Sequence, residues 1–346
     1  MEQTVRRSEE EWAMVKELAM LKTENTDPRH NLALERYLTM HTKEGECILY
    51  LWQNRKTVVI GRNQNAWKEC RADALTRDGG FLVRRLSGGG AVFHDLGNLN
   101  FTFCVRKENY DLARQLEVIL RAVRKFGIQA EKTGRNDITV DGRKFSGNAF
   151  FESGDFCYHH GTIMVRVDTD RMTQYLNVPE DKLRSKGVAS VRARVVNLSE
   201  LCPEITVPLL SEKLRESFGE VYGLPVRTMS EEQLDGREIG EWAERFSSWD
   251  WIFGRRIPFT NEVSRRFSWG NADLALKVNG GRIEACRIWS DAMDEEKIRA
   301  AQEALTGCRY DRTAMAEALQ SDPALRSAPG MREDLSILTE ELFTQA

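Results

Sequence analysis

Residues 98–105 alternate without a break between apolar and polar side chains. Leu99 and every second residue after it fall on one side of an extended chain, and the polar residues fall on the other. Such alternation is typical of a β-strand with one apolar face. Further short strand-like runs and two single helical stretches, near residues 28–41 and 110–126, follow no regular strand–helix repeat. We therefore expect an α+β fold with a mainly antiparallel or mixed sheet.

The composition excludes several classes of protein. The 346 residues are 41% hydrophobic and 30% charged, which is enough for one large or two ordinary domains with packed cores. A formal net charge of −3 argues against a dedicated nucleic-acid-binding protein. No apolar run approaches the roughly 18 residues that span a bilayer, and the N-terminus lacks the apolar core of a signal peptide. The seven cysteines include no C-x-x-C pair. We expect a cytoplasmic chain with free thiols and neither a membrane nor a nucleic acid as partner.

Local signals divide the chain into segments. Residues 1–25 are charged, and we expect a solvated helix or a loose arm that is dispensable for chemistry. Asp27 followed by Pro28 predicts the start of a helix. Asp141-Gly142 between strand-like residues predicts a tight hairpin turn. A second unit is expected after the aromatic stretch at 249–259, with a strand–turn–strand signal around 279–281 and three helices near 294–305, 311–319 and 331–344.

The glycine triplet at 88–90 lies between two strand-like segments and follows Arg84 and Arg85. Glycine lets backbone N–H groups approach a ligand closely, and guanidinium groups suit a phosphate or a carboxylate. The same triplet is also typical of a flexible turn, and its spacing matches neither a Walker loop nor a Rossmann fingerprint. The residues alone leave both interpretations open.

For other polar residues, too, an ordinary structural role is an alternative to a functional one. His94 precedes Asp95, and His159 precedes His160. Adjacent strand residues point to opposite faces, so a metal site is not favoured at either pair. Lys144 follows a predicted turn, where most lysines are solvated. Five basic residues and no acidic ones occur within 182–194, which fits a solvated surface or an anion-binding loop.

Several separated segments, taken in order, resemble the signatures of the lipoate–protein ligase family. Four carry the main likeness: GRNQNAWKE at 61–69, RRLSGGGAVFHDLGNLNFTF at 84–103, GRNDITVDGRKFSGNAF at 134–150 and HHGTIM at 159–164. KGVASVRARVVNL at 186–198 resembles the family's flexible adenylate-binding loop. SSWDWIFGRRIPF at 247–259 and FSWGNADLAL at 267–276 resemble the lead-in and start of its C-terminal accessory domain. The likeness covers roughly residues 28–344.

The resemblance implies a fold and a reaction. The fold is a large catalytic domain of the biotin/lipoate ligase type, with mixed β-sheets and flanking helices, plus a small α+β C-terminal domain. We place an N-terminal arm at 1–25, the catalytic domain at 26–253 and the accessory domain at 258–346. The implied reaction joins lipoate and ATP, with Mg²⁺, into lipoyl-AMP, which a lysine ε-amine then attacks. The implied acceptors are lipoyl domains of 2-oxoacid dehydrogenase complexes and the glycine cleavage H protein.

The resemblance also assigns residues. Lys144 is the implied catalytic residue, with an electrostatic role toward the lipoyl carbonyl oxygen and the α-phosphate. Asp137 is our nominee for a Mg²⁺ ligand, and Leu86, Val92 or Phe150 for the apolar slot of the lipoyl tail. The implied ATP and adenylate contacts are Arg85, Gly88, Gly89, Gly90, Ala91, Val92, Phe93, Lys144, Lys186 and Val188. The implied lipoate contacts are Arg85, His94, Asn98, Lys144, Gly147, His160 and Gly161.

Several related functions stay open at this point. A lipoyl- or octanoyltransferase of the same fold would need a cysteine nucleophile, for which Cys157 is the candidate. An amidotransferase that takes lipoate from a lipoylated protein would share most motifs. A biotin ligase fits the glycine-rich motif less well. A non-catalytic lipoate-binding protein is opposed by the presence of Lys144 and Arg85.

Overall fold

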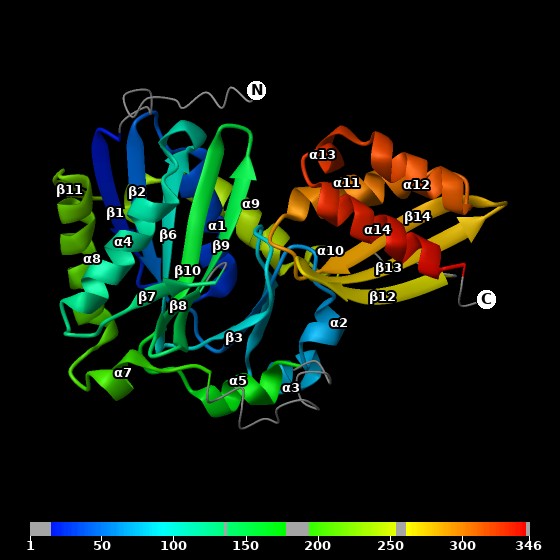
Figure 1. Cartoon of the computed structure of the whole chain (residues 1–346). Coiled ribbons are helices and arrows are strands. Elements are labelled where there is room, and N and C mark those ends of the chain that lie inside the picture. The colour runs from blue at the N-terminus through cyan, green and yellow to red at the C-terminus, as the bar shows by residue number, and fades with distance from the viewer. Residues whose placement is uncertain (1–14, 135–136, 178–193, 254–260, 344–346) are drawn as a thin grey trace. The chain divides into compact units, whose positions relative to one another are not determined.

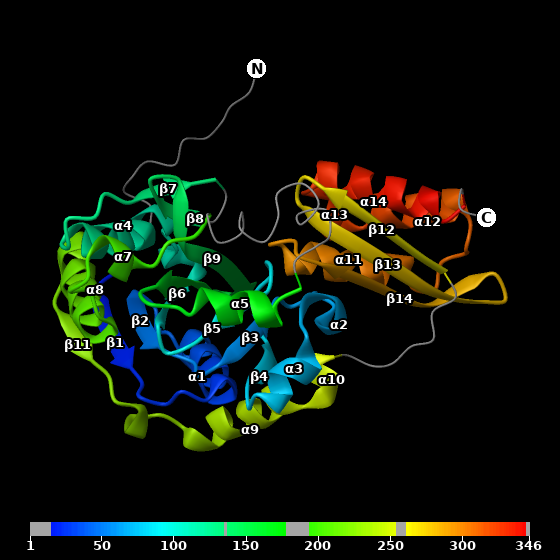
Figure 2. The same ribbon diagram turned by 90° about the horizontal axis from the view of Figure 1, so that it is seen from below.

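The structure, a computed structural model, describes residues 15–134, 137–177, 194–253 and 261–343. These residues form two compact units that interleave along the chain (Figures 1 and 2). The second unit contains residues 58–93, 175–177 and 247–346, and the first contains the remainder. Each unit is described below by itself. The domain boundaries that we placed at 25, 253 and 258 stay a prediction.

The first unit is built on an eight-stranded mixed sheet. Strand β1 pairs in parallel with both of its neighbours, whereas the other pairings in the sheet are antiparallel. This architecture confirms the predicted α+β class. In spatial order the strands are β11 (Val226–Thr228), β1 (Glu17–Lys22), β2 (Glu46–Trp52), β6 (Asn98–Arg106), β10 (Phe156–Met164), β9 (Arg143–Ser153), β8 (Asp137–Val140) and β7 (Glu131–Thr133).

Helices cover both faces of this sheet. Helices α4 (Leu112–Arg124) and α8 (Val207–Tyr222) lie side by side on the apolar face, where they enclose the main core (Figure 1). Helix α1 (Pro28–Met40) packs on the opposite face, against β2, β6 and β10. As predicted, Asp27 caps α1 by accepting a hydrogen bond from the Arg29 N–H. The alternating sequence of residues 98–105 correctly predicted a strand, β6, with one apolar and one polar face. The polar face is buried as well as the apolar one.

Smaller elements complete the first unit. They connect the strands or pack beside α1, as α9 does through an ion pair and a cation–π contact between Arg36 and residues Glu238 and Trp242. These elements are a 3₁₀ turn at Lys107–Asn109, helix α5 (Thr169–Tyr175), helix α7 (Leu198–Leu201), a 3₁₀ turn at Glu231–Gln233 and helix α9 (Gly236–Ser247).

Strand β1 corrects our interpretation of the N-terminal arm. We expected a solvated helix or a loose arm through residue 25, and this is wrong over Glu17–Lys22. Leu18, Ala19, Met20 and Leu21 are all buried, since β1 lies between β2 and β11. A four-residue apolar run is typical of a strand buried on both faces. Residues 1–14 lie outside the described part of the chain.

We predict that deleting residues 1–22 prevents folding of the first unit. The deletion removes four buried side chains and leaves β2 and β11 without their shared partner, so several kcal/mol of stability are lost. Deletion of residues 1–14 is the matched control. Thermal unfolding followed by circular dichroism tests this prediction. If the protein that lacks residues 1–22 unfolds cooperatively at the same temperature as the full-length protein, the prediction is contradicted.

The second unit contains two three-stranded sheets. The first has the order β4 (Phe81–Arg84), β3 (Thr57–Ile60), β5 (Val92–His94), although the end residues Thr57 and His94 are counted with the first unit. Around it lie three short helices, α2 (Ala66–Glu69), α3 (Ala72–Arg77) and α10 (Trp249–Ile252).

The other sheet of the second unit is an antiparallel meander with helices on one face (Figure 1). The predicted turn at 279–281 joins β13 to β14, and Gly280 and Gly281 both have positive φ. All three predicted helices are present, whereas strand β12 was not expected. The elements are β12 (Asn261–Phe267), β13 (Gly270–Asn279), β14 (Arg282–Ser290), α11 (Glu295–Leu305), α12 (Arg312–Ser321), α13 (Pro323–Arg326) and α14 (Pro329–Glu341). None of the helices described here is long and apolar enough to cross a membrane.

Candidate active site

The strand register gathers polar motif residues on the α1 face of the large sheet. Residues directly opposite each other on paired strands project from the same face. One row across the sheet therefore consists of Trp52, Asn100, Thr162, Gly147 and Asp137. The adjacent row consists of Tyr50, Thr102, His160 and Ala149.

Lys144 lies at the end of the first row, after the predicted hairpin turn. Asp141 and Gly142 adopt φ values of +50° and +72°, which confirms the turn. The Lys144 Nζ is 2.7 Å from Asp137 Oδ1, and each side chain is 38% exposed. The nominated Mg²⁺ ligand is thus the ion-pair partner of the lysine in this structure. The ammonium is held in place and is still accessible to a ligand.

Gly147 makes room for this ammonium. A Cβ atom at position 147 would lie 2.9 Å from Lys144 Nζ and 3.0 Å from Cε. The Gly147 N–H donates to Thr162 Oγ1 at 3.3 Å, which joins β9 to β10 beneath the lysine. Gly147 therefore has a physical role in the site that sequence reasoning assigned only by resemblance.

The backbone of Lys144 is also paired. Its N–H donates to the Arg194 carbonyl at 2.7 Å, and its carbonyl accepts from the Val196 N–H at 2.9 Å. The chain that leaves the expected adenylate-binding loop is therefore bonded directly to the lysine's own residue. Lys186 and Val188 of that loop lie outside the described residues.

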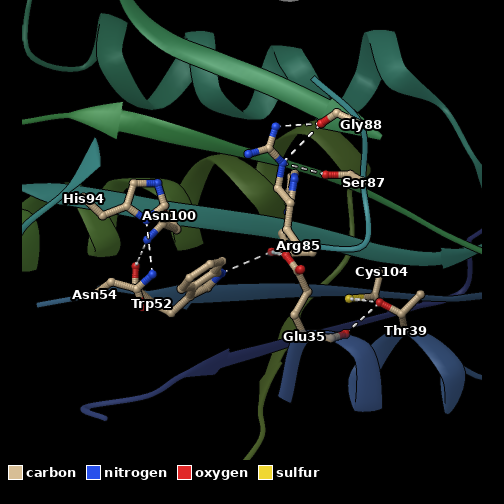
Figure 3. A network of polar contacts seen from close by, with 12 residues as sticks. Glu35, Thr39, Trp52, Asn54, Arg85, Ser87, Gly88, His94, Asn100 and Cys104 are labelled. Carbon is tan, nitrogen blue, oxygen red and sulfur yellow. Dashed lines mark hydrogen bonds and ion pairs between the residues drawn. The ribbon is translucent and has the colours of Figure 1, made fainter. Parts of the chain in front are cut away.

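A buried network holds His160 in the second row, and Figure 3 shows two of its members, Glu35 and Trp52. Glu35 Oε1 accepts hydrogen bonds from Thr102 Oγ1 at 2.7 Å and from His160 Nδ1 at 2.8 Å. Trp52 Nε1 in turn donates to Thr102 Oγ1 at 3.2 Å. Glu35 of α1 thus ties together Thr102 of β6 and His160 of β10 in the second row.

Sequence reasoning missed Glu35, although a signal was present. Asn31, Glu35 and Thr39 recur every four residues on α1 and are all buried. Polar residues at this spacing form one stripe on a helix, which here faces the polar side of the sheet. Such a stripe indicates a buried polar network rather than a solvated surface.

His94 and Asn98 lie in a neighbouring buried cluster. Figure 3 shows His94 of this cluster together with Asn54, Trp52 and Asn100. His94 Nδ1 is 3.2 Å from Asn54 Nδ2, and its ring meets the Trp52 ring edge-on at 6.2 Å. Asn98 Nδ2 donates to Asn100 Oδ1 at 2.9 Å. The structure thus brings both residues to the end of the same sheet face.

The Cβ position at Gly161 points to the opposite face of the sheet. A Cβ there would lie 2.6 Å from the Phe101 ring and 2.7 Å from the Gly147 carbonyl oxygen. Phe150, a candidate for the lipoyl-tail slot, also lies on this face, stacked on His159 at 5.1 Å. The side-chain positions of Gly161 and Phe150 therefore belong to the α4 side, away from Lys144.

His159 is a buried core histidine. It stacks between Phe103 and Phe150 and lies 2.8 Å from Asn148 Oδ1. Burial lowers the pKa of His159 to about 3. The ring is therefore neutral throughout the physiological range, and it is not a proton carrier.

We predict that His159 makes the fold acid-sensitive. Below pH 6.5 the unfolded chain binds a proton that the folded chain does not bind until about pH 3. Stability is therefore fully present above pH 6.5 and falls by about 1.4 kcal/mol per pH unit below it. Urea unfolding between pH 7 and 4 should show a shallower decline in His159→Gln than in the wild type. His41→Gln, at an exposed site, is the control, and equal slopes in all three proteins would refute the assignment.

In the second unit, Arg85 holds the glycine loop closed (Figure 3). It is 5% exposed, and its guanidinium donates to Ser87 Oγ at 3.0 Å, to the Gly88 carbonyl at 2.6 Å and to the Gly90 carbonyl at 2.8 Å. The structure therefore shows Arg85 organising the loop that precedes Ala91, Val92 and Phe93. A phosphate contact by Arg85 stays a prediction.

Arg84 has a purely structural role. Its side chain is buried and donates to five carbonyl groups, which belong to Gly61, Arg62, Gln64, Trp251 and Ile252. Burial, together with neighbouring arginines, lowers its pKa to about 9, so the group stays charged at neutral pH. The acceptors offset the cost of burying that charge and fix α10 to the 61–64 turn.

The described residues offer little support for nucleophilic or metal chemistry. Cys157 is buried, and burial raises the pKa of its thiol to about 12. A thiol in this state is a poor nucleophile at neutral pH. Within the described ranges, no group of three histidine, cysteine, aspartate or glutamate side chains is arranged to hold a metal ion.

Comparisons with known proteins decide the family. The "Lipoyl protein ligase A/B catalytic domain" model matches residues 27–219, and the "Bacterial lipoate protein ligase C-terminus" model matches residues 256–328. "Lipoate-protein ligase A" of Psychrobacter cryohalolentis is 41% identical over 303 residues, which cover 85% of this chain and 89% of the relative. The chain belongs to the lipoate–protein ligase family. It is accordingly an enzyme of the ligase class.

Several solved structures of similar proteins share the fold. LipL1 of P. falciparum in complex with lipoate is 30% identical, with a TM-score of 0.77 and coverage of 88% of this chain and 94% of its own. A lipoate-protein ligase A bound with ATP is 25% identical, with a TM-score of 0.59 and coverage of 69% and 99%. A bipartite ligase studied with its E2 lipoyl domain, from Thermoplasma acidophilum, is 26% identical, with a TM-score of 0.60 and coverage of 70% and 99%. These matches confirm the predicted fold class.

Proposed function

We propose that this ligase activates lipoate with ATP to form lipoyl-AMP and then transfers the lipoyl group to a lysine ε-amine. The observation that carries the proposal is the Lys144 ammonium, held 2.7 Å from Asp137 above Gly147, on the same sheet face as His160. A relative with lipoate and a relative with ATP support the choice of substrates.

The chemistry of adenylation needs such a cation. The lipoate carboxylate and the ATP phosphates are both anionic, so bringing them together requires positive donors. An ammonium that bridges the lipoyl carbonyl oxygen and the α-phosphate would stabilise the charge that develops at phosphorus. In the absence of substrates, Asp137 would keep that ammonium in position. Lys144 is thus assigned an electrostatic role rather than a covalent one.

The remaining site residues divide by substrate. For ATP and the adenylate we propose Arg85, residues 88–93 and the loop that carries Lys186 and Val188. For lipoate we propose Arg85 with His94, Asn98, Lys144, Gly147, His160 and Gly161, where Gly161 would contribute backbone atoms. Mg²⁺ prefers oxygen ligands and retains several waters and phosphate oxygens. The half-exposed Asp137 carboxylate fits that preference, and Mg²⁺ would supply charge neutralisation at the phosphates.

We also propose acceptors, a location and a domain arrangement. The Thermoplasma ligase studied with its lipoyl domain supports lipoyl domains of 2-oxoacid dehydrogenase complexes, and by extension the glycine cleavage H protein, as acceptors. We infer a cytoplasmic location. The family matches at 27–219 and 256–328 support a catalytic domain ending near 253 and an accessory domain from 258, with β1 as an added part of the former.

ATP–pyrophosphate exchange tests the proposed reaction. Lipoate, octanoate and biotin are offered in turn, and we expect exchange with lipoate and none with biotin. Apo-lipoyl domain and apo-H protein then serve as acceptors, each beside a variant whose target lysine is arginine. Lipoylation from a lipoylated donor without ATP would instead favour an amidotransferase. Absence of exchange with every acid would refute the ligase mechanism.

A further inference from the structure

The three consecutive glycines occupy two different environments within the second unit. A Cβ on Gly88 would lie 2.4 Å from the Ala292 carbonyl oxygen and 2.7 Å from the Met293 carbonyl oxygen. Both atoms belong to the backbone, so they cannot move aside cheaply. A Cβ on Gly90 would meet nothing within 4 Å, and Gly90 is exposed. Close packing therefore requires glycine at 88 but not at 90.

The turn between β14 and α11 makes this close approach. The Gly89 N–H donates to the Ala292 carbonyl at 3.0 Å. Nearby, the Ser290 N–H donates to the Asn63 carbonyl at 2.8 Å, and Asn63 Nδ2 donates to the Glu295 carbonyl at 3.3 Å. Three hydrogen bonds thus join residues 290–295 to the glycine loop and to the 61–64 turn.

An ion pair supports the same contact from the side. Lys68 Nζ of α2 lies 3.1 Å from Asp273 Oδ2 of β13, and the Asp273 side chain is largely buried. Asn271 Nδ2 also donates to Asp273, which fixes the carboxylate. Lys68 is therefore a side chain through which the contact can be weakened without altering the glycine loop.

We propose that residues 291–293 act as a seat for the glycine loop, with Gly88 and Gly89 packed on the seat and the chain from Gly90 onward left for the nucleotide. The Gly89 N–H is used by Ala292, so within the proposed 88–93 segment Gly88 and Gly89 fix the loop and the backbone from Gly90 onward is left to approach the phosphates. The seat residues are positioning residues that touch no reactant. This inference rests on the proposed ligase function, and it names the part of the second unit that adenylation depends on.

Charge reversal at Lys68 tests the seat. Lys68→Glu replaces an attraction worth up to about 1 kcal/mol by a repulsion, so we expect a three- to tenfold rise in the ATP KM for adenylation. The lipoate KM and the melting temperature should stay unchanged, because the altered contact lies outside the lipoate contacts and the core. The double variant Lys68→Glu/Asp273→Lys should restore most of the loss. Lys277→Glu, which breaks an ion pair with Glu284 inside the same hairpin, is the matched control.

Gly88→Ala tests the seat directly. The added methyl group cannot fit beside Ala292, and a displacement of about 1 Å in a positioning element costs about a hundredfold in rate. Because both changes act through one contact, Lys68→Glu should have no further effect in the Gly88→Ala protein. The proposal would be overturned if the effects of Lys68→Glu and Gly88→Ala on adenylation multiplied in the double variant. It would also be overturned if the Lys68→Glu protein had the wild-type ATP KM.

Hydrogen exchange separates failure of the seat from failure of the proposed function. In Lys68→Glu, amides of residues 86–93 and 288–295 should exchange faster than in the wild type and in Lys277→Glu. This readout needs no catalysis. If the wild type forms no adenylate but this exchange pattern appears, the ligase mechanism fails and the docking contact stands. If adenylation proceeds but exchange is unchanged, the seat is wrong.

Discussion

Replacing Lys144 with alanine should abolish formation of lipoyl-AMP while leaving the fold intact. Loss of a donor aimed at developing charge costs a factor of about 10² to 10³ in rate, and more when that donor joins both reactants. The fold should survive because the lysine side chain is partly exposed and contributes one ion pair with Asp137. Single-turnover adenylate formation, measured beside thermal unfolding, tests both parts of the prediction.

Two further variants sharpen this test. Lys144→Arg should not restore the rate, because a planar guanidinium does not occupy the space of a compact ammonium. Lys132→Ala removes an exposed lysine from β7 of the same sheet and should change little. Lipoate affinity should fall less than the rate, because the apolar tail still binds. A Lys144→Ala protein with near-normal rates would show that the active site has been misassigned.

Gly147→Ala should produce a stable protein with about a hundredfold lower rate of adenylation. The new methyl group would lie 2.9 Å from Lys144 Nζ, which is the mobile end of a flexible side chain. The ammonium can therefore move at little cost in stability, but it then leaves the position in which it serves both reactants. Single-turnover kinetics and a melting curve on the same preparation provide the measurement.

Gly161→Ala is the informative contrast. Its methyl group would meet the Phe101 ring and the Gly147 backbone, so we expect a large loss of stability there. In a Lys144→Ala background, Gly147→Ala should have no additional effect on rate, since both changes act through one ammonium. A Gly147→Ala enzyme with wild-type kinetics would show that Lys144 works from another position.

Much of the fold could be predicted because its signals are local. The Asp27 cap and the Asp141-Gly142 turn each depend on a few neighbouring residues, and both were found where expected. Strand β1 was missed because its apolar run is only four residues long and lies between charged residues. Strand β12 was missed because Val263 is its only fully buried residue. In both strands the tertiary partner, not the local sequence, decides the structure.

The assignment of the site residues stays a prediction, and the sheet faces on which they lie could not be predicted from the sequence. Motifs placed His160 and Gly161 together, yet their side-chain positions lie on opposite faces of β10. Only the register shows that His160 shares a face with Lys144. The partners of Arg85 are carbonyl groups of its own loop, and no residue pattern indicates such contacts. Glu35 could have been found from the polar stripe on α1.

The position of β1 has a consequence for synthesis of the chain. Leu18 pairs with Val226, so β1, the first strand in the described part of the chain, gains its outer neighbour about 200 residues after it is synthesised. At about 5–20 residues per second, that delay amounts to roughly 10–40 s. Until then one edge of an apolar strand presents unpaired N–H and C=O groups, which can join strands of other nascent chains. Yield in the cell should therefore respond to chaperones that cover this N-terminal segment during translation.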